Sequence, residues 1–128
     1  MTKGKVVLVP FPFDDSSASK VRPAVCLTNP IGPHRHVVLA FITSQAPMDL
    51  QPTDVLLDPQ QPGFAATGLR VASVVRLHRM LTLTTTSIQR ELGELPPASQ
   101  AEANRKIAIL FGNTPHIRPM GSNTCTPS

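Results

Sequence analysis

Two short motifs place residues that could handle a phosphate group beside strand-forming segments. Arg22 leads into the segment Arg-Pro-Ala-Val-Cys-Leu, and Thr43 ends an apolar run that begins at residue 37. An arginine presents a planar fork of N–H donors that pairs with phosphate, and a hydroxyl can donate to a developing oxyanion. Brought together by the fold, the two side chains suit phosphoryl chemistry on a nucleic acid without a metal. The plainer alternative is that both are ordinary polar residues at strand ends.

Other combinations of reactive side chains give weaker signals. His34 and His36 are spaced as H-x-H, but no further ligands at suitable spacing accompany them, so we interpret them as exposed histidines and expect no metal and no cofactor. The adjacent Asp14 and Asp15 would diverge in an extended chain, which makes them loop acids rather than a carboxylate pair. The sequence has no phosphate-binding loop, dinucleotide fingerprint or C-x-x-C motif.

The charge distribution indicates a polyanionic partner. The chain of 128 residues has a net charge of +4, and no acid occurs between Asp58 and Glu91, a window that contains Arg70, Arg76 and Arg79. We expect this window to form a basic surface. The absence of Trp and Tyr argues against an extensive base-stacking platform.

The composition indicates one cytoplasmic globular domain. An apolar fraction of 41% suits a small protein with a single core. The longest apolar run, residues 37–42, is far too short to span a bilayer. Pro10 and Pro12 interrupt the apolar stretch near the N-terminus, which argues against a signal peptide.

Turns rich in proline and glycine divide the chain into short apolar segments of strand character and one amphipathic segment. We predict strands over residues 5–13, 21–28, 36–45, 54–58, 69–83 and 88–95, and a helix over residues 100–111. Residues 69–83 form either one bent strand or two short ones, and a helical turn is the alternative for residues 88–95. The pattern predicts a mainly β (α+β) fold, a small barrel with a C-terminal helix. We assign residues 1–112 to this domain and predict that the polar tail, residues 113–128, is disordered.

Residue patterns within these segments predict orientation and ends. Over residues 21–28 the bulky side chains share one face, so Arg22 projects from the other face, which we expect to be open. The alternation in the strand over residues 69–83 would turn Arg79 inward, so we expect a bulge there. For the helix, Ser99 is the expected N-cap of a capping box.

The order of these segments resembles the MazF/PemK family of toxins. The matching parts are GKVVLVPFPFDD, SASKVRPAVCL, VVLAFITSQ, GLRVASVVRLHRMLTL and IQRELGEL, followed by a terminal helix. The resemblance covers residues 4–112, and its most specific parts are Arg-Pro-Ala-Val at residues 22–25 and Ile-Thr-Ser-Gln at residues 42–45. The chain departs from many relatives at its start, where lysine rather than aspartate follows Gly4.

The resemblance implies an SH3-like barrel that forms a homodimer and cleaves single-stranded RNA, often messenger RNA, without a metal. The implied products carry 2′,3′-cyclic phosphate and 5′-hydroxyl ends. Arg22 and Thr43 match the family's catalytic pair, which implies that Arg22 stabilises the pentavalent phosphate and that Thr43 binds a non-bridging oxygen. The loop before Arg22 gates the RNA groove in this family, which implies RNA contacts for Ser19 and Lys20.

Further contacts are expected around this pair. Ser44 and Gln45 complete the second motif, and we expect both to contact RNA. From composition alone, Arg70, Arg76 and His78 are expected to extend the phosphate track. The resemblance also implies a cognate antitoxin that inserts an acidic, initially disordered segment into the groove.

Two other hypotheses assign the same fold a function that does not include RNA cleavage. The first is a basic barrel that binds nucleic acid, or regulates its own operon, without cutting; it predicts affinity that survives loss of Arg22. The second is an SH3-like peptide adaptor, which the lack of Trp and Tyr disfavours.

Overall fold

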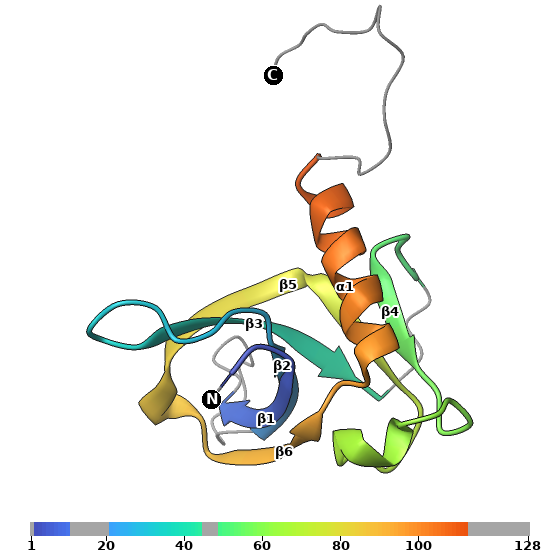
Figure 1. Cartoon of the computed structure of the whole chain (residues 1–128), viewed down its shortest axis with the longest axis horizontal. Coiled ribbons are helices and arrows are strands. Elements are labelled where there is room, and N and C mark those ends of the chain that lie inside the picture. Colours follow the sequence, from blue (N-terminus) through green and yellow to red (C-terminus); the bar gives the residue numbers. More distant parts are fainter. Residues whose placement is uncertain (1, 11–20, 45–48, 113–128) are drawn as a thin grey trace, which may run out of the picture.

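The computed structural model describes residues 2–10, 21–44 and 49–112. These ranges form six strands, two short 3₁₀ helices and one α-helix (Figure 1). Every predicted strand and the predicted helix is present, with ends that differ from the prediction by a few residues. The elements are β1 (Lys5–Pro10), β2 (Val21–Cys26), β3 (His36–Thr43), β4 (Asp54–Leu57), η1 (Phe64–Thr67), β5 (Ser73–Thr84), η2 (Thr85–Ser87), β6 (Arg90–Glu94) and α1 (Pro97–Leu110).

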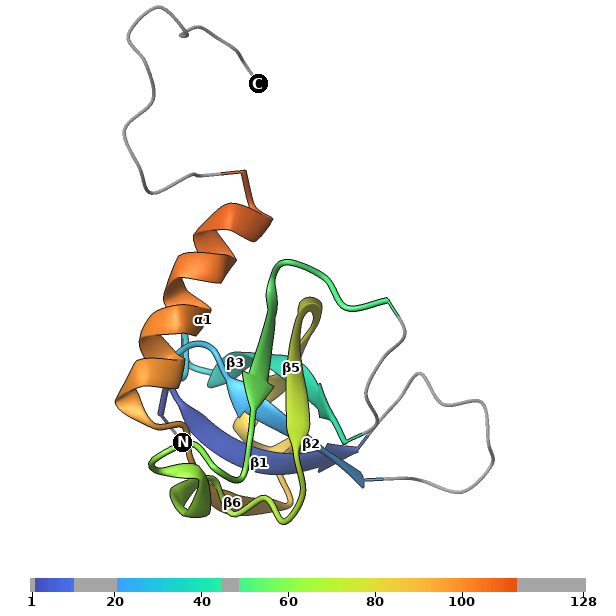
Figure 2. The same cartoon turned by 90° about the vertical axis from the view of Figure 1, so that its right-hand side faces the viewer.

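All six strands belong to one antiparallel sheet with the order β4-β5-β3-β2-β1-β6. The β-branched residues that fill β1 and β3 favour extended backbone. The sheet curls into a half-barrel, and α1 stands at one side of it, next to β4 (Figures 1 and 2). This architecture confirms the predicted mainly β fold with a C-terminal helix.

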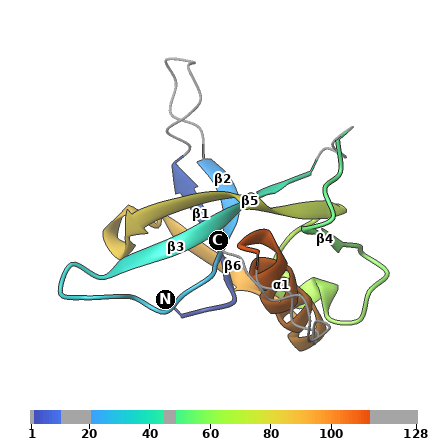
Figure 3. The ribbon, with the colours of Figure 1, turned by 90° about the horizontal axis from the view of Figure 1, so that it is seen from above.

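The longest strand, β5, bends at a bulge. Met80 pairs with Ala40, whereas Arg76 pairs with Phe41, the next residue of β3, which leaves three residues of β5 in the bulge. The exposed Arg79 is one of them, so the predicted bulge is confirmed. Before the bulge β5 pairs with both β3 and β4, and after it with β3 alone. Figure 3 shows β5 lying along β3 on both sides of this bend.

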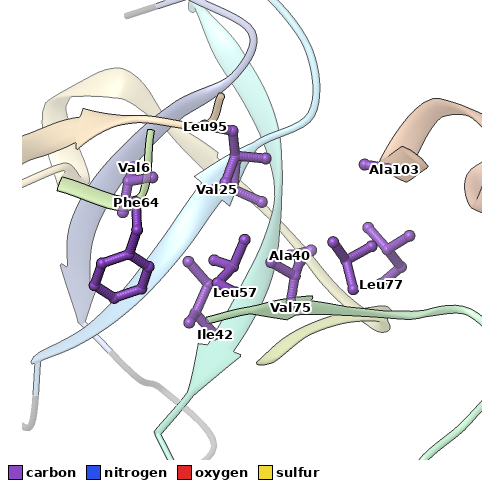
Figure 4. Packing of buried hydrophobic residues seen from close by; sticks show 11 residues of the cluster. Val6, Val25, Ala40, Ile42, Leu57, Phe64, Val75, Leu77, Leu95 and Ala103 are labelled. Atoms are coloured by element: carbon purple, nitrogen blue, oxygen red, sulfur yellow. The ribbon is translucent and has the colours of Figure 1, made fainter. Parts of the chain in front are cut away.

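One apolar cluster joins the sheet to the two helices that pack against it. Five of the strands contribute side chains, Phe64 enters from η1, and Ala103 enters from α1 (Figure 4). Burial of these side chains supplies the main driving force for folding. The buried members are Val6, Val25, Ala40, Ile42, Val55, Leu57, Phe64, Val75, Leu77, Leu95 and Ala103.

A second apolar cluster lies on the opposite face of the sheet. The expectation of an open face around Arg22 was therefore wrong for most of β2, because β5 bends past its bulge and brings Leu81 and Leu83 onto this face. Within β2, exposure is confined to the first two residues, Val21 and Arg22. The buried members of the second cluster are Val7, Val9, Ala24, Cys26, Val37, Leu39 and Phe41.

Cys26 is a free, buried thiol in the second cluster. Burial raises the pKa of this thiol from 9.0 to about 11, because the apolar surroundings disfavour the thiolate. The raised pKa means that this residue's contribution to stability is complete below pH 9 and is lost as the pH rises toward 11.

We expect a Cys125→Ser variant, which retains Cys26 alone, to react with a thiol reagent at pH 8 only after unfolding. Rapid labelling of the folded protein would contradict this burial.

The helix begins earlier than its sequence predicts. Pro97 is its first residue, and Pro96 is the N-cap without a side-chain hydrogen bond, so the predicted capping box at Ser99 is wrong. The rigid ring of proline suits the first helical position, where no N–H donor is needed. Gly112 follows the helix with a φ of 86° and donates to Ile109 at 3.0 Å. Within the described residues, no helix is long and apolar enough to cross a membrane.

Candidate active site

The strand register brings Arg22 and Thr43 to the same place on the sheet. Ala24 of β2 pairs with Phe41 of β3. This is the last pair of the ladder, and Arg22 and Thr43 lie two residues beyond it in their strands, on the face that Ala24 and Phe41 share. On its other side Arg22 pairs with Val9 of β1. The juxtaposition that the two motifs required is therefore present.

Both residues line a cleft of about 350 Å³ at this end of the sheet. Among the described residues that line it, the charged ones are all arginines. Thr43 and Ser44 supply hydroxyl groups, and neither a carboxylate nor an imidazole belongs to this part of the lining. The described lining residues are Arg22, Pro23, Phe41, Ile42, Thr43, Ser44, Arg76 and Arg79.

Arg76 is the buried arginine of the cleft, on the same face as Phe41 with which it pairs. Its side chain is 10% exposed, and its Nε lies 3.1 Å from Oδ1 of Asp54, whose side chain is 2% exposed. The contact is an ion pair without hydrogen-bond alignment, since neither atom has a hydrogen-bond partner in the described structure. Nη1 lies 3.5 Å from the exposed Asp49.

The predicted RNA-binding residues separate into three groups. Ser44 and Arg76 line the cleft, and Arg76 is buried instead of lying on the expected basic surface. Arg70 and His78 are exposed and lie outside the described cleft lining. Ser19, Lys20 and Gln45 lie outside the described residues, as does the predicted C-terminal tail.

Arg79 lines the cleft although the sequence reasoning did not name it as a site residue. The predicted bulge carried the signal, because it turns this arginine away from the apolar interior, but the sequence reasoning drew no site role from it. Asp54 was also missed. It pairs with Arg76 across β4 and β5, and only the strand register reveals that relation.

The described residues contain no group of three histidines, cysteines or carboxylates placed to hold a metal ion. The ring centroids of His34 and His36 are 6.0 Å apart with the rings tilted by 59°. Both are exposed near the hairpin between β2 and β3, in agreement with their interpretation as exposed histidines.

Comparison with family models connects this geometry with a known group of proteins. The model of the PemK-like, MazF-like toxins of type II toxin–antitoxin systems matches residues 2–111. The chain belongs to this toxin family. The match spans all the described elements, which include both site motifs. A comparison with curated proteins found no significant match.

Solved structures of MazF proteins share the fold. The Mycobacterium tuberculosis toxin MazF-mt6 is 24% identical, with 84% of this chain and 95% of that chain covered and a TM-score of 0.64. A MazE–MazF structure from Deinococcus radiodurans is 24% identical, with coverages of 88% and 96% and a TM-score of 0.67. An endoribonuclease in complex with its cognate antitoxin, from a mycobacterial species, is 21% identical, with coverages of 88% and 95% and a TM-score of 0.62.

Proposed function

We propose that this MazF/PemK toxin is an endoribonuclease that cleaves single-stranded RNA without a metal. The observation that carries the proposal is the placement of Arg22 and Thr43 in one cleft that two further arginines line. Membership of the toxin family supports it, as do structural neighbours whose names describe them as endoribonucleases. Its site of action would be the cytoplasm, where messenger RNA is translated.

In the proposed reaction the ribose 2′-oxygen attacks the adjacent phosphorus. The 2′-hydroxyl loses its proton, the bond from phosphorus to the 5′-oxygen breaks, and the 5′-oxygen leaves with a proton. The products carry a 2′,3′-cyclic phosphate and a 5′-hydroxyl. Arg22 stabilises the added negative charge on the pentavalent phosphate, and the hydroxyl of Thr43 donates to a non-bridging oxygen. Arg22 keeps its proton in the resting state and is not the general base.

The remaining RNA contacts follow the strand ends around the cleft. Ser44 and Arg76 would bind the phosphates next to the cleaved one, since both line the cleft. The exposed Arg70 and His78 would contact the strand further out. We retain Ser19, Lys20 and Gln45 as RNA contacts on the motif match alone.

The partners of the toxin follow from its family. The Deinococcus radiodurans neighbours include MazE–MazF structures, and a mycobacterial neighbour is in complex with its cognate antitoxin. We propose a cognate antitoxin whose acidic, disordered segment competes with RNA for the arginine-lined cleft. We also propose that the toxin acts as a homodimer.

The experiment that tests the function is a cleavage assay with purified protein, a long single-stranded RNA and excess EDTA. The expected result is cutting at defined sites, with 2′,3′-cyclic phosphate and 5′-hydroxyl ends found by end-group analysis. A requirement for Mg²⁺ would overturn the metal-free mechanism. Tight binding of RNA without any cutting would favour the alternative of a non-catalytic nucleic-acid-binding or autoregulatory protein.

Replacing Thr43 with valine should lower kcat by about 10- to 100-fold, because valine keeps the shape but removes the donor to the phosphate oxygen. The KM should change by less than about threefold, since the donor acts mainly in the transition state. Thr82→Val is the matched control, because Thr82 is an exposed strand residue outside the described cleft lining. An equal loss of kcat in both variants would contradict the assignment of Thr43 to the proposed site.

A further inference from the structure

The buried position of Arg76 needs a physical explanation. Removing a guanidinium from water costs several kcal/mol unless a counter-charge and hydrogen-bond acceptors for its N–H groups replace the lost hydration. The side chain lies at the cleft with its Nε against Asp54, on the strand next to its own. A surface position would have supplied the same charge to RNA at no such cost. Burial therefore indicates that the orientation of the guanidinium matters.

Asp54 is itself held firmly. Its Oδ2 accepts a hydrogen bond of 2.8 Å from the backbone N–H of Gln51, and its own backbone N–H donates to the Gln51 carbonyl at 3.0 Å. From α1, Lys106 donates to the backbone carbonyl of Asp54 at 2.8 Å and pairs with Glu102 at 2.7 Å. The carboxylate is thus fixed on the sheet before any ligand arrives.

The contact with Asp54 selects which donors of Arg76 can meet a ligand. A guanidinium is planar, so fixing Nε against a rigid carboxylate limits rotation of the whole group. Nη1 has only the exposed and weakly held Asp49 nearby, and Nη2 has no ion-pair partner among the described residues. The two Nη groups therefore remain as the edge that can pair with a phosphate.

We infer that Asp54 is a positioning residue, which holds the guanidinium of Arg76 in the cleft so that its Nη edge meets the RNA phosphate beside Arg22 and Thr43. The inference rests on the proposed function for its substrate. It gives Asp54 no contact with RNA, because Asp54 is not among the described residues that line the cleft. Its effect on cleavage passes through Arg76, whose Nε lies 3.1 Å from Asp54 Oδ1; Nδ1 of the exposed His78 lies 3.9 Å from the same oxygen, too far for a hydrogen bond.

A purely structural role for the ion pair makes a different prediction. In that case the double variant Asp54→Asn, Arg76→Met, which removes both buried charges, would cut RNA at the wild-type rate. Under the positioning role, Arg76→Met lowers kcat by about 10- to 100-fold, and Asp54→Asn lowers it by about tenfold. Neither variant should raise KM as much as it lowers kcat.

The test is a double-mutant cycle on single-stranded RNA cleavage with Asp54→Asn, Arg76→Met and the double variant. The double variant should cut as fast as Arg76→Met alone, because Asp54 has nothing left to position. A double variant at least fivefold slower than Arg76→Met would overturn the inference. Asp58→Asn is the matched control: Asp58 is exposed, follows β4 and binds only the turn at Gln60 in the described structure.

Two arrangements keep the test decisive. Asp54→Asn leaves a buried guanidinium unpaired and can unfold the protein, so thermal unfolding is measured for every variant. Arg76→Met in turn leaves the Asp54 carboxylate, whose side chain is 2% exposed, without this cation, whereas the double variant leaves neither charge of the pair buried and unpaired. The rates of these two variants are compared at a temperature at which both are folded, and this comparison decides between the outcomes. If the wild-type protein does not cut RNA, the proposed reaction is refuted. The inference is then tested by the affinity of each variant for a 2′-O-methyl RNA oligonucleotide instead of by its cleavage rate. Arg76→Met and the double variant must then bind equally, and at least fivefold more weakly than wild type.

Discussion

Replacement of Arg22 with alanine is expected to lower the rate of RNA cleavage by about 10³-fold. A single donor to a developing oxyanion contributes about 10² to 10³ in kcat, and Arg22 supplies a fixed charge as well as donors. The loss should appear in kcat more than in KM, because the phosphate gains its extra charge only in the transition state. Single-turnover cleavage of a long single-stranded RNA, with EDTA present, measures the effect directly.

Two further variants separate the reasons for this loss. Arg22→Lys keeps the charge but loses the planar fork, and it should retain only a few per cent of the activity. Arg105→Ala removes the same charge from the exposed surface of α1 and should cut as wild type does. Undiminished cleavage by Arg22→Ala would refute the assignment of the site. Arg22 lies at the exposed start of β2, so the folded state of the variant should be intact.

Gly93→Ala is expected to destabilise the folded protein by about 3 kcal/mol, at the upper end of what overpacking usually costs. At Gly93 an added Cβ would lie 2.1 Å from the carbonyl oxygen of Ala66 and 2.5 Å from the carbonyl carbon of Thr67. Both atoms are backbone, so the clash can be relieved only if η1 and β6 move apart. A Cβ added at Gly68 would clash in the same way with the backbone carbonyl of Leu92.

Chemical denaturation of Gly93→Ala, compared with Gly32→Ala, measures this prediction. Gly32 has a φ of 74°, and an added Cβ there meets nothing within 4 Å. That control reports only the strain of a left-handed backbone, which costs about 1 to 2 kcal/mol. Equal stability of the wild type and Gly93→Ala would show that η1 does not pack against β6 in this way.

Local sequence signals were sufficient for the elements and for the placement of Arg22 and Thr43 in one cleft. Runs of β-branched residues between turn signals predict strands such as β1 and β3, because backbone preference and burial agree in them. The shared cleft was predictable because Arg22 begins one recognisable strand motif and Thr43 lies at the end of another strand. The bulge at Arg79 was predictable because a charge cannot occupy an inward position of a regular strand.

Features that depend on register or on a distant segment were not predictable. The ion pair of Arg76 with Asp54 joins residues 22 positions apart through the pairing of β4 and β5. The burial beneath Arg22 comes from residues beyond the bend in β5. At the helix, Ser99 matched a capping box, but the observed N-cap is Pro96, three residues earlier. Several local patterns can satisfy a helix start, and only tertiary packing selects among them.

Because of the bulge in β5, mutations in the two halves of this strand can have independent effects. Before it, Arg76 faces the cleft; after it, Leu81 and Leu83 pack in the second apolar cluster. Because the register shifts between these parts, a substitution that repacks Leu81 can change stability without rotating Arg76 out of the cleft. Sequence drift in the second half of the strand is therefore compatible with an unchanged arrangement of arginines. The same strand can vary in its core while the charge that it presents to the cleft stays constant.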